Sequence, residues 1–396
     1  MKKVIYLDNA ATTKVRPEVV EAMLPFYTEH YGNPSSVYGF SNPCKEAMAH
    51  TRAVIAGSLG AKDNEIFFTG GGSEADNWAL VAAAEAYASK GKHIITTGIE
   101  HHAILHTGQY LEKRGFEVTY LPVDEFGLVD PEEVKKAIRP DTILLSVMFA
   151  NNEIGTVQPV AEIGAVCREA GVLFHTDAVQ AAGHLPIDAE AMHIDLLSLS
   201  AHKFHGPKGV GVLYAHKGIP LETVIYGGAQ ERGKRAGTEN LPGICGAAAA
   251  FDEACANMER EADHLTALRD RLIDGLLAIP HTALNGDPVR RLPGNVNVCF
   301  EGIEGESLLL MLDEKGIAAS SGSACTSGSL DPSHVLLALG RPHEVAHGSL
   351  RLSLTGSNTM EEVEYILNVL PGIVSYLREM SPVWDELERG VRPHLI

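Results

Sequence analysis

Short apolar runs alternate with amphipathic helical patterns through the first two thirds of the chain, and this alternation strongly constrains the fold. Seven runs have the length and apolar character of buried strands: EIFFTG, HIITTG, EVTYLPV, TILLSVMFA, VLFHTDA, LLSLSA and GVLYA. Helical stretches such as EADNWALVAAAEAYASKG and VAEIGAVCREAG lie between them. The pattern predicts an α/β fold with a largely parallel sheet that is covered by helices on both faces.

The character of the sequence changes at about residue 258. A long charged helical pattern, MEREADHLTALRDRLIDGLLAI, leads into NVNVCFEG, a further helix and GSLRLSL. Since 396 residues exceed one ordinary domain, we predict a large domain over residues 16–257 and a smaller α+β domain made of residues 1–15 and 258–396. In the smaller domain, the Ser- and Gly-rich run AASSGSACTSGSL predicts a mobile loop over about residues 320–332.

Charge and apolar patterning exclude several classes of partner. The formal net charge is −19, so nucleic acid and anionic membrane surfaces would be repelled, and neither is expected as a partner. The first apolar run stops at Asp8, which is too short for a signal peptide, and no other run is long enough to span a bilayer. We therefore expect a cytoplasmic protein whose cysteines are reduced.

The chain contains six cysteines, and the absence of a Cys-x-x-Cys pair argues against a structural zinc site. Four cysteines lie among apolar or small residues and are expected to be buried: Cys167, Cys245, Cys255 and Cys299. Cys325 is the first candidate for a reactive thiol, because its Ser, Gly, Ala and Thr neighbours could not bury it in a core. Cys44, at an expected helix start, is the second.

Polar residues follow the carboxyl ends of the predicted strands, where open α/β sheets bind their ligands. After the first strand, the glycines and helix start of GGGSEADN would form an anion cup at Gly72 and Ser73. The residues after later strands are His101, His102, Asn151, Asn152, Asp177, Gln180, Ser200, His202 and Lys203. Each could be an ordinary capping or surface residue, but together they meet the needs of pyridoxal 5′-phosphate (PLP). PLP requires a lysine for a Schiff base, an aspartate for its pyridinium nitrogen and a phosphate cup.

Four motifs carry a family resemblance: HTDAVQAAG, SLSAHKFHGPKGVG, ERGKRAGTEN and SSGSACTSGS. Together they resemble the cysteine desulfurases of the NifS/IscS group, which are class-V, fold-type-I PLP enzymes, and the likeness runs from YLDNAATT to GSLRLSL. The segment EGIEGESLLLMLDEKGIAASSGSACTSG is closer to the NifS branch. Ser73 stands where relatives usually carry threonine, and it keeps the hydroxyl. The resemblance assigns no role to the tail SPVWDELERGVRPHLI, residues 381–396.

The resemblance assigns the chemistry to five residues. Lys203 would hold PLP as a Schiff base and move a proton from the substrate, L-cysteine. His101 would stack on the cofactor ring and assist proton transfer, Asp177 would pair with the pyridinium nitrogen, and Gln180 would bond the ring hydroxyl. Cys325 would attack the substrate sulfur and carry it away as a persulfide, leaving L-alanine. Cys325 could also be a transient iron–sulfur ligand, and no other metal ligand is predicted.

The resemblance assigns binding to a second group of residues. The phosphate would be held by Gly72, Ser73, Ser200 and His202, and by Thr238 of the partner subunit in a homodimer. Asn152, which also belongs to the expected cofactor pocket, and Arg351 would bind the substrate carboxylate, because a guanidinium fork matches a carboxylate with two hydrogen bonds.

Two other functions share these features. Another class-V PLP enzyme, such as a selenocysteine lyase or an aminotransferase, would share Lys203 and Asp177, but transamination needs no thiol such as Cys325. A non-enzymatic sulfur carrier would not need the lysine, aspartate and histidine together. The acceptor expected for the sulfur is an iron–sulfur scaffold protein of the NifU/IscU kind or another protein. Nitrogenase cluster assembly, general iron–sulfur assembly and tRNA thiolation all remain open as its pathway.

Overall fold

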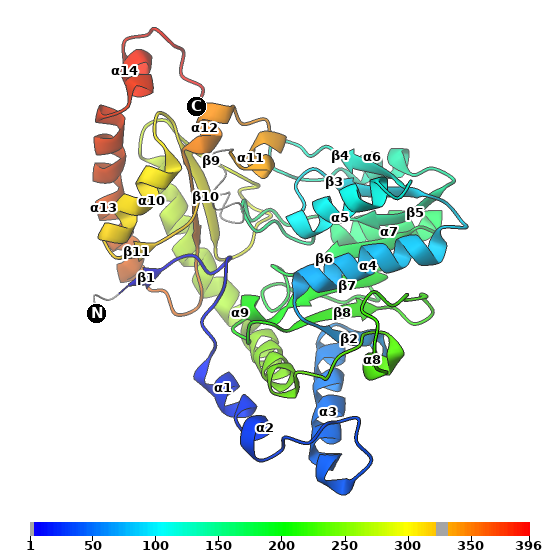
Figure 1. Cartoon of the computed structure of the whole chain (residues 1–396). Helices are drawn as coiled ribbons and strands as arrows, with labels where there is room; N and C mark the ends of the chain where they lie inside the picture. The colour runs from blue at the N-terminus through cyan, green and yellow to red at the C-terminus, as the bar shows by residue number, and fades with distance from the viewer. Residues whose placement is uncertain (1–3, 322–331) are drawn as a thin grey trace.

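The computed structural model describes residues 4–321 and 332–396 of the chain. The larger half contains seven strands: β2 (Ile66–Thr69), β3 (His93–Thr97), β4 (Glu117–Leu121), β5 (Thr142–Ser146), β6 (Leu173–Asp177), β7 (Leu196–Ser200) and β8 (Gly211–Ala215). They form one sheet in the order β2-β8-β7-β6-β5-β3-β4 (Figure 1). Strands β7, β6, β5, β3 and β4 pair in parallel, whereas β8 is antiparallel to both of its neighbours. The seven predicted strands and the largely parallel sheet are confirmed.

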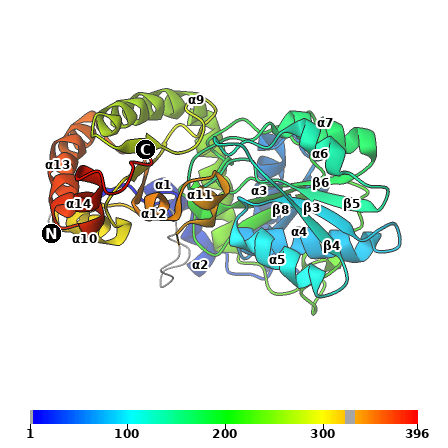
Figure 2. The same cartoon turned by 90° about the horizontal axis from the view of Figure 1, so that it is seen from above.

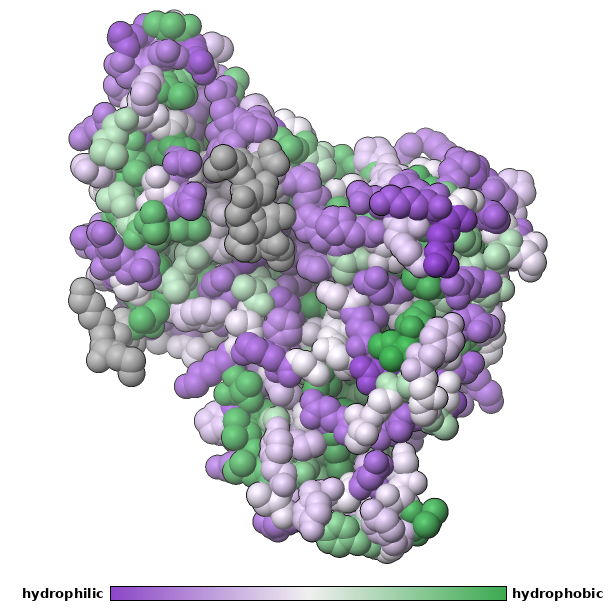
Figure 3. All heavy atoms as spheres, viewed as in Figure 1, coloured by the Kyte–Doolittle hydropathy of each residue, from purple (hydrophilic) through white to green (hydrophobic). Residues whose placement is uncertain are grey.

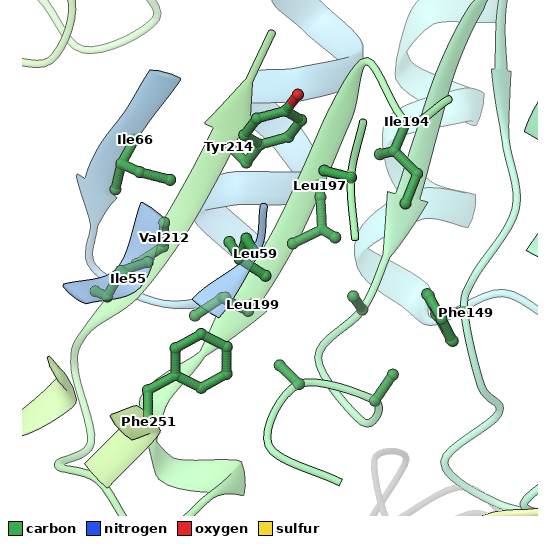
Figure 4. Packing of buried hydrophobic residues seen from close by; sticks show 14 of the residues in the cluster. Ile55, Leu59, Ile66, Phe149, Ile194, Leu197, Leu199, Val212, Tyr214 and Phe251 are labelled. Atoms are coloured by element: carbon green, nitrogen blue, oxygen red, sulfur yellow. The ribbon is translucent and has the colours of Figure 1, made fainter. Parts of the chain in front are cut away.

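Helices cover both faces of this sheet, as predicted (Figure 2). The main covering helices are α3 (Asn42–Ser58), α4 (Gly72–Tyr87), α5 (His102–Glu112), α7 (Val160–Ala170) and α9 (Leu241–Leu277). Helices α4 and α5 share one apolar core with Leu196 of β7. Helices α3, α7 and α9 share another core with the next residue, Leu197 (Figure 4). Successive strand residues point to opposite faces, so both can be apolar only when both faces are covered.

The smaller half is built on a three-stranded antiparallel sheet with its own apolar core. Strand β10 (Asn295–Phe300) lies between β9 (Thr282–Leu284) and β12 (Ser349–Ser353). Helices α10 (Gly305–Glu314) and α13 (Met360–Glu379) contribute to the core. The start of the chain joins this half, because β1 (Ile5–Tyr6) pairs in parallel with β11 (Ile317–Ala318).

The 37-residue helix α9 runs through both halves of the molecule. The amide group of Asn240 caps its first turn by accepting a hydrogen bond from the Gly243 N–H at 3.2 Å. We expected a helix from about residue 258, but the apolar segment before it is helical too, because it packs in the core that it shares with α3. The predicted domain boundary between residues 257 and 258 therefore falls inside a continuous helix, and it stays a prediction.

The remaining helices are short. They are α1 (Pro17–Met23), α2 (Pro25–Thr28), α6 (Pro131–Ala137), α8 (Gln230–Gly233), α11 (His334–Ala338), α12 (His343–His347) and α14 (Pro382–Glu388), with 3-10 turns at Gly39–Ser41, Asp63–Glu65 and Ala201–Lys203. Within residues 4–321 and 332–396, no helix has both the length and the apolar character needed to cross a bilayer.

Candidate active site

Neighbouring parallel strands bring the predicted central residues together. Asp177 is the last residue of β6, and it lies in register with Ser198 of the adjacent β7. Ser200 ends β7, and Lys203 follows within the Ala201–Lys203 turn. His101 follows β3 and caps α5, where its Nδ1 accepts a hydrogen bond from the Ala103 N–H at 3.1 Å. The carboxyl ends of three strands thus form one side of the site, as the sequence predicts.

Asp177, His101 and Lys203 interact electrostatically. Burial raises the pKa of Asp177, while His101, a hydrogen bond from the Val179 N–H and the Lys203 ammonium oppose the rise. Burial lowers the pKa of His101, while Asp177 opposes that shift and Lys203 adds to it. These mutual effects place the three side chains within electrostatic range of one another, with Asp177 buried and Lys203 partly exposed. Among the predicted catalytic groups, these three form a cluster.

The N-terminal segment after β1 lies against the lysine turn. Lys203 Nζ donates hydrogen bonds to the carbonyl oxygens of Ala10 at 2.5 Å and Ala11 at 2.9 Å. Gln180 Nε2 donates to the same Ala10 oxygen at 3.0 Å. His202 Nδ1 lies 3.1 Å from Thr12 Oγ1. The motif YLDNAATT therefore forms part of the site, a role that reasoning from strand ends missed because this segment follows no strand of the large sheet.

The predicted phosphate cup lies at the first turn of α4. A Cβ on Gly72 would approach Val179 Cγ2 to 2.7 Å and Ser200 Cβ to 3.4 Å, so the backbone there passes close to the ends of β6 and β7. Gly71, which precedes the helix, has φ +155°. Ser73 is exposed in this turn. Gly72, Ser73 and Ser200 are thus neighbours around a helix N-terminus that favours an anion.

Arg351 belongs to the small half but reaches the edge of the site. It is buried, and its Nη2 donates to Asp8 Oδ1 at 2.8 Å, while Nη1 donates to the Asn152 carbonyl at 3.3 Å. Its Nε is buried and has no hydrogen-bond partner among residues 4–321 and 332–396. The predicted pair of Asn152 and Arg351 is therefore in contact, and Asp8 is an additional partner that the sequence pattern did not reveal.

Other predicted residues are less well placed by the structure. Thr238 is exposed in the segment between α8 and α9. Cys325 lies outside the described residues. Its flanks are attached to the site: Ser320 and Arg351 exchange backbone hydrogen bonds, and the Ser333 hydroxyl donates to the buried carboxylate of Glu153.

The other five cysteines have apolar or partly apolar surroundings. Cys44, our second candidate nucleophile, is fully buried on α3, and its thiol lies 3.1 Å from the His30 carbonyl oxygen. Cys167 and Cys299 are buried, whereas Cys245 and Cys255 are partly exposed. The expectation of burial is thus met fully by two of the four cysteines named for it, and only in part by Cys245 and Cys255.

A layer of buried ionisable groups lies behind Asp177 and was not predicted. Asp76 Oδ1 on α4 lies 3.8 Å from His175 Nε2 on β6, and His175 Nδ1 lies 2.8 Å from Ser146 Oγ. Burial lowers the pKa of His175 to about 3 and raises that of Asp76, and the Asp177 charge raises Asp76 further. Burial also raises the pKa of Glu100 to about 8. Since His175 and Asp177 are two positions apart on one strand, this neighbourhood was readable from the motif HTDAVQ.

The arrangement fits PLP on three counts. Asp177 is a buried carboxylate that a cationic ring nitrogen would stabilise. Lys203 lies within electrostatic range of that carboxylate. The tight backbone at Gly72 and the start of α4 offer N–H groups to a phosphate.

The chain matches the class-V aminotransferase family over residues 5–366, and it belongs to that family. Within the family, it belongs to the cysteine desulfurases of the NifS/IscS group. It is 60% identical over 389 residues to the cysteine desulfurase IscS of Clostridium botulinum strain Hall, with 98% of each chain covered. It is 60% identical over 381 residues to the cysteine desulfurase IscS of Methanosarcina thermophila, covering 96% of this chain and 94% of the relative. A solved NifS-like protein superposes with a TM-score of 0.89 at 42% identity, covering 94% of this chain and 100% of that one.

This membership confirms the predicted fold type I and the PLP cofactor. The relatives carry both the IscS and the NifS names, so a closer tie to the NifS branch stays a prediction.

Proposed function

We propose that this protein removes sulfur from L-cysteine, releasing L-alanine and leaving a persulfide on Cys325. The observation that carries the proposal is the cluster of Lys203, Asp177 and His101 at the carboxyl ends of three strands, in a chain of the cysteine desulfurase group. The relatives are named cysteine desulfurases, so their name indicates cysteine as the substrate. The cluster supplies the residues that such chemistry requires.

PLP, when bound, supplies an electron sink for breaking bonds at the carbons of an amino acid. The chain's own residues then have distinct tasks. Asp177 holds a negative charge in a buried position beside the cofactor's expected nitrogen. Lys203 Nζ holds and moves a proton at the substrate α-carbon. Burial lowers the pKa of His101, so the ring is neutral near pH 7, and because its Nδ1 accepts the Ala103 N–H, the ring proton lies on Nε2 and can be donated there.

Arg351 is the proposed carboxylate-binding residue. Its buried Nε, which has no hydrogen-bond partner in the described parts of the chain, is a donor available to a ligand. Asp8 holds the other side of the guanidinium through Nη2, which orients it before the substrate arrives. Asp8 is therefore a positioning residue, and Arg351 contacts the substrate.

The proposed sulfur transfer balances in atoms. The Cys325 thiolate forms a bond with the substrate sulfur, the substrate carbon–sulfur bond breaks, and that carbon gains a proton to give alanine. The products are a persulfide and L-alanine. The next thiol to attack the persulfide belongs to an acceptor, and we propose an iron–sulfur scaffold protein of the NifU/IscU kind.

An assay with L-cysteine and a thiol reductant tests the proposal. Sulfide and alanine should appear in equal amounts, with no need for a 2-oxo acid. An aminotransferase would instead require a 2-oxo acid acceptor and form a 2-oxo acid from cysteine. A selenocysteine lyase would release selenide from selenocysteine and little sulfide from cysteine. Failure to form alanine from cysteine would overturn the proposal.

We also propose a homodimer. Seven large apolar residues are exposed on the segment from α1 to the start of α3: Val20, Leu24, Tyr27, Tyr31, Val37, Tyr38 and Phe40. Figure 3 shows hydrophobic residues at the lower end of the molecule, where α1, α2 and α3 lie. Val37 is 97% exposed, which is unfavourable unless a partner covers it. A second copy, expected from the resemblance at Thr238, is the proposed occupant.

A cytoplasmic location is proposed as well. The five described cysteines are all unpaired, as in a reducing compartment.

A further inference from the structure

Two histidines and one glutamate meet where the C-terminal segment returns to the small half. His394 Nδ1 lies 2.7 Å from Glu301 Oε2, and His281 Nδ1 lies 3.4 Å from the same oxygen. The two imidazole rings stack with their centroids 3.7 Å apart. One candidate ligand atom from each residue lies within 4.8 Å of the others. The Glu301 side chain is only 4% exposed, so its charge is poorly solvated.

This geometry is close to that of a tetrahedral metal site. Zinc binds imidazole nitrogen at about 2.0–2.1 Å and carboxylate oxygen at about 2.0–2.2 Å, which places tetrahedral ligands about 3.3 Å apart. The separation of 3.4 Å between His281 Nδ1 and Glu301 Oε2 fits, whereas the 2.7 Å between His394 Nδ1 and the same oxygen is a direct hydrogen bond that metal binding would lengthen. The two imidazoles face one buried carboxylate oxygen, and a bound cation would place positive charge beside that carboxylate.

The donor set selects the class of metal. Two nitrogen ligands disfavour calcium and magnesium, which prefer oxygen, and imidazole with carboxylate suits zinc and its first-row neighbours. Three protein ligands leave a fourth position open. The main-chain oxygen of Ile396 lies 3.1 Å from His281 Nδ1, and a metal ion bound at that nitrogen would replace this hydrogen bond.

We propose that His281, Glu301 and His394 bind one zinc-class divalent ion that fastens the C-terminal segment to the small half. His281 precedes β9 and Glu301 follows β10, so both are held by the small sheet, whereas His394 is in the segment after α14. The ion would therefore join two ligands held by the small sheet to one ligand from the C-terminal segment.

The contacts around the cluster show what the ion would hold in place. The Leu395 N–H donates to Glu301 Oε1 at 2.6 Å, and Arg392 pairs with Glu344 of α12 at 3.2 Å. Ile396 packs against the apolar cluster that includes Val335 of α11. Helix α11 directly follows Ser333, which bonds Glu153 at the edge of the site. Binding of the C-terminal segment to the small half should therefore also stabilise α11, which lies next to the proposed catalytic centre.

Zinc titration of the PLP-loaded, full-length protein tests this site. The parent protein and each variant in this experiment carry Cys325→Ser, so the proposed reactive thiol contributes no metal ligand. After treatment with a chelator, we expect one equivalent of Zn²⁺ to bind per chain, and we expect X-ray absorption to show nitrogen and oxygen ligands without sulfur. The variant His394→Gln should lose this stoichiometric binding, since glutamine keeps a hydrogen-bond donor but removes the imidazole. The control His343→Ala alters an exposed histidine of α12 and should bind like the parent.

A second measurement separates metal binding from damage to the fold. Zn²⁺ should slow tryptic cleavage after Arg389, which precedes Gly390, in the parent, and it should not do so in His394→Gln. Without zinc, that variant should still unfold in one cooperative transition, with a midpoint lowered by the loss of the His394–Glu301 contact, and zinc should raise the midpoint of the parent but not that of the variant. Absence of stoichiometric zinc binding would overturn the proposal, and so would binding that survives both His394→Gln and Glu301→Gln. Since activity is not a readout, this outcome does not depend on the proposed desulfurase function.

Discussion

At the scale of the residue, Lys203 should carry the cofactor. Lys203→Ala should lose the absorbance of protein-bound PLP in the visible or near-ultraviolet, because Lys203 is the lysine that the turn after β7 places near Asp177. Borohydride reduction of the parent followed by peptide mapping locates the labelled lysine. A label on Lys208, the nearest lysine along the chain, would show that the assignment is wrong.

Cys325 and Cys44 can be told apart by substitution. Cys325→Ala should keep PLP and the spectral response to L-cysteine, but sulfide and alanine formation should fall to background. Cys44→Ala should keep nearly full turnover, because its thiol is buried on α3 and bonded to the His30 carbonyl. The substitution Cys44→Ala should reduce stability modestly, because removing the buried thiol leaves a small cavity. The reverse pattern of turnover would identify Cys44 as the nucleophile.

Arg351 should act mainly in substrate binding. Removing a charge-assisted contact that leaves a carboxylate unpaired costs about 2–5 kcal/mol, so Arg351→Ala should raise KM for L-cysteine roughly 30-fold or more. Asp8→Asn is the matched variant, since it keeps an oxygen near Nη2 while removing the charge. It should raise KM less and leave the PLP spectrum unchanged. A KM in Arg351→Ala equal to that of the parent contradicts the role.

At the scale of the element, the connection from β3 to α5 contains a buried acid with a defined pH signature. Burial raises the pKa of Glu100 to about 8, while its carboxylate accepts bonds from the Thr97 hydroxyl and the Met148 N–H. The folded state keeps the proton that the unfolded state releases above its lower, ordinary pKa. Stability from this group is therefore present at low pH and is lost as pH rises toward about 8.

The variant Glu100→Gln should lose less stability than the parent as the pH rises. Between about pH 5 and pH 8, the slope of unfolding free energy against pH should change by up to about 1.4 kcal/mol per pH unit. The exposed Glu169→Gln on α7 is the control and should follow the parent. Thermal midpoints measured across this range give the comparison, and parallel curves for Glu100→Gln and the parent would count against the assignment.

The strands and the strand-end residues were predictable because each is a local signal. An apolar run bounded by polar residues specifies a buried strand, and parallel strands bring their carboxyl ends to one edge, which places Asp177 beside Ser200 and Lys203. Local signals could not reveal contacts of long sequence separation. Asp8 meets Arg351 across 343 positions, and the Ala10 carbonyl meets Lys203 across 193. The start of α9 was missed because an alanine-rich apolar segment has no marked amphipathic period.

At the scale of the whole molecule, we predict that two chains share each site through Thr238. Thr238→Asp should empty the site by placing negative charge against the phosphate, and Lys203→Ala should be inactive for a different reason. Co-expressed in equal amounts, half of the dimers would be mixed, and each mixed dimer would contain one intact site. Roughly a quarter of all sites should then be active.

A site formed within a single chain predicts a different activity for the mixture. If Thr238 serves its own chain, every site in the mixture has one lesion, and desulfurase activity stays at the level of the two single variants. Size-exclusion chromatography of each variant is the control, because both must still dimerise. The charge substitution Val37→Glu, in the exposed apolar segment before α3, should weaken the dimer if that segment is the contact surface.

The pairing of β1 with β11, and of Asp8 with Arg351, has a consequence for protein synthesis. The ribosome synthesises the first member of each pair hundreds of residues before the second. Strand β1 therefore has no pairing partner while the seven strands of the large sheet are translated. A nascent chain that stalls before β11 contains Lys203 but lacks Arg351, the residue proposed to bind the substrate carboxylate. Completion of the substrate site is thereby coupled to completion of the chain, and an unfinished desulfurase does not consume the cell's cysteine.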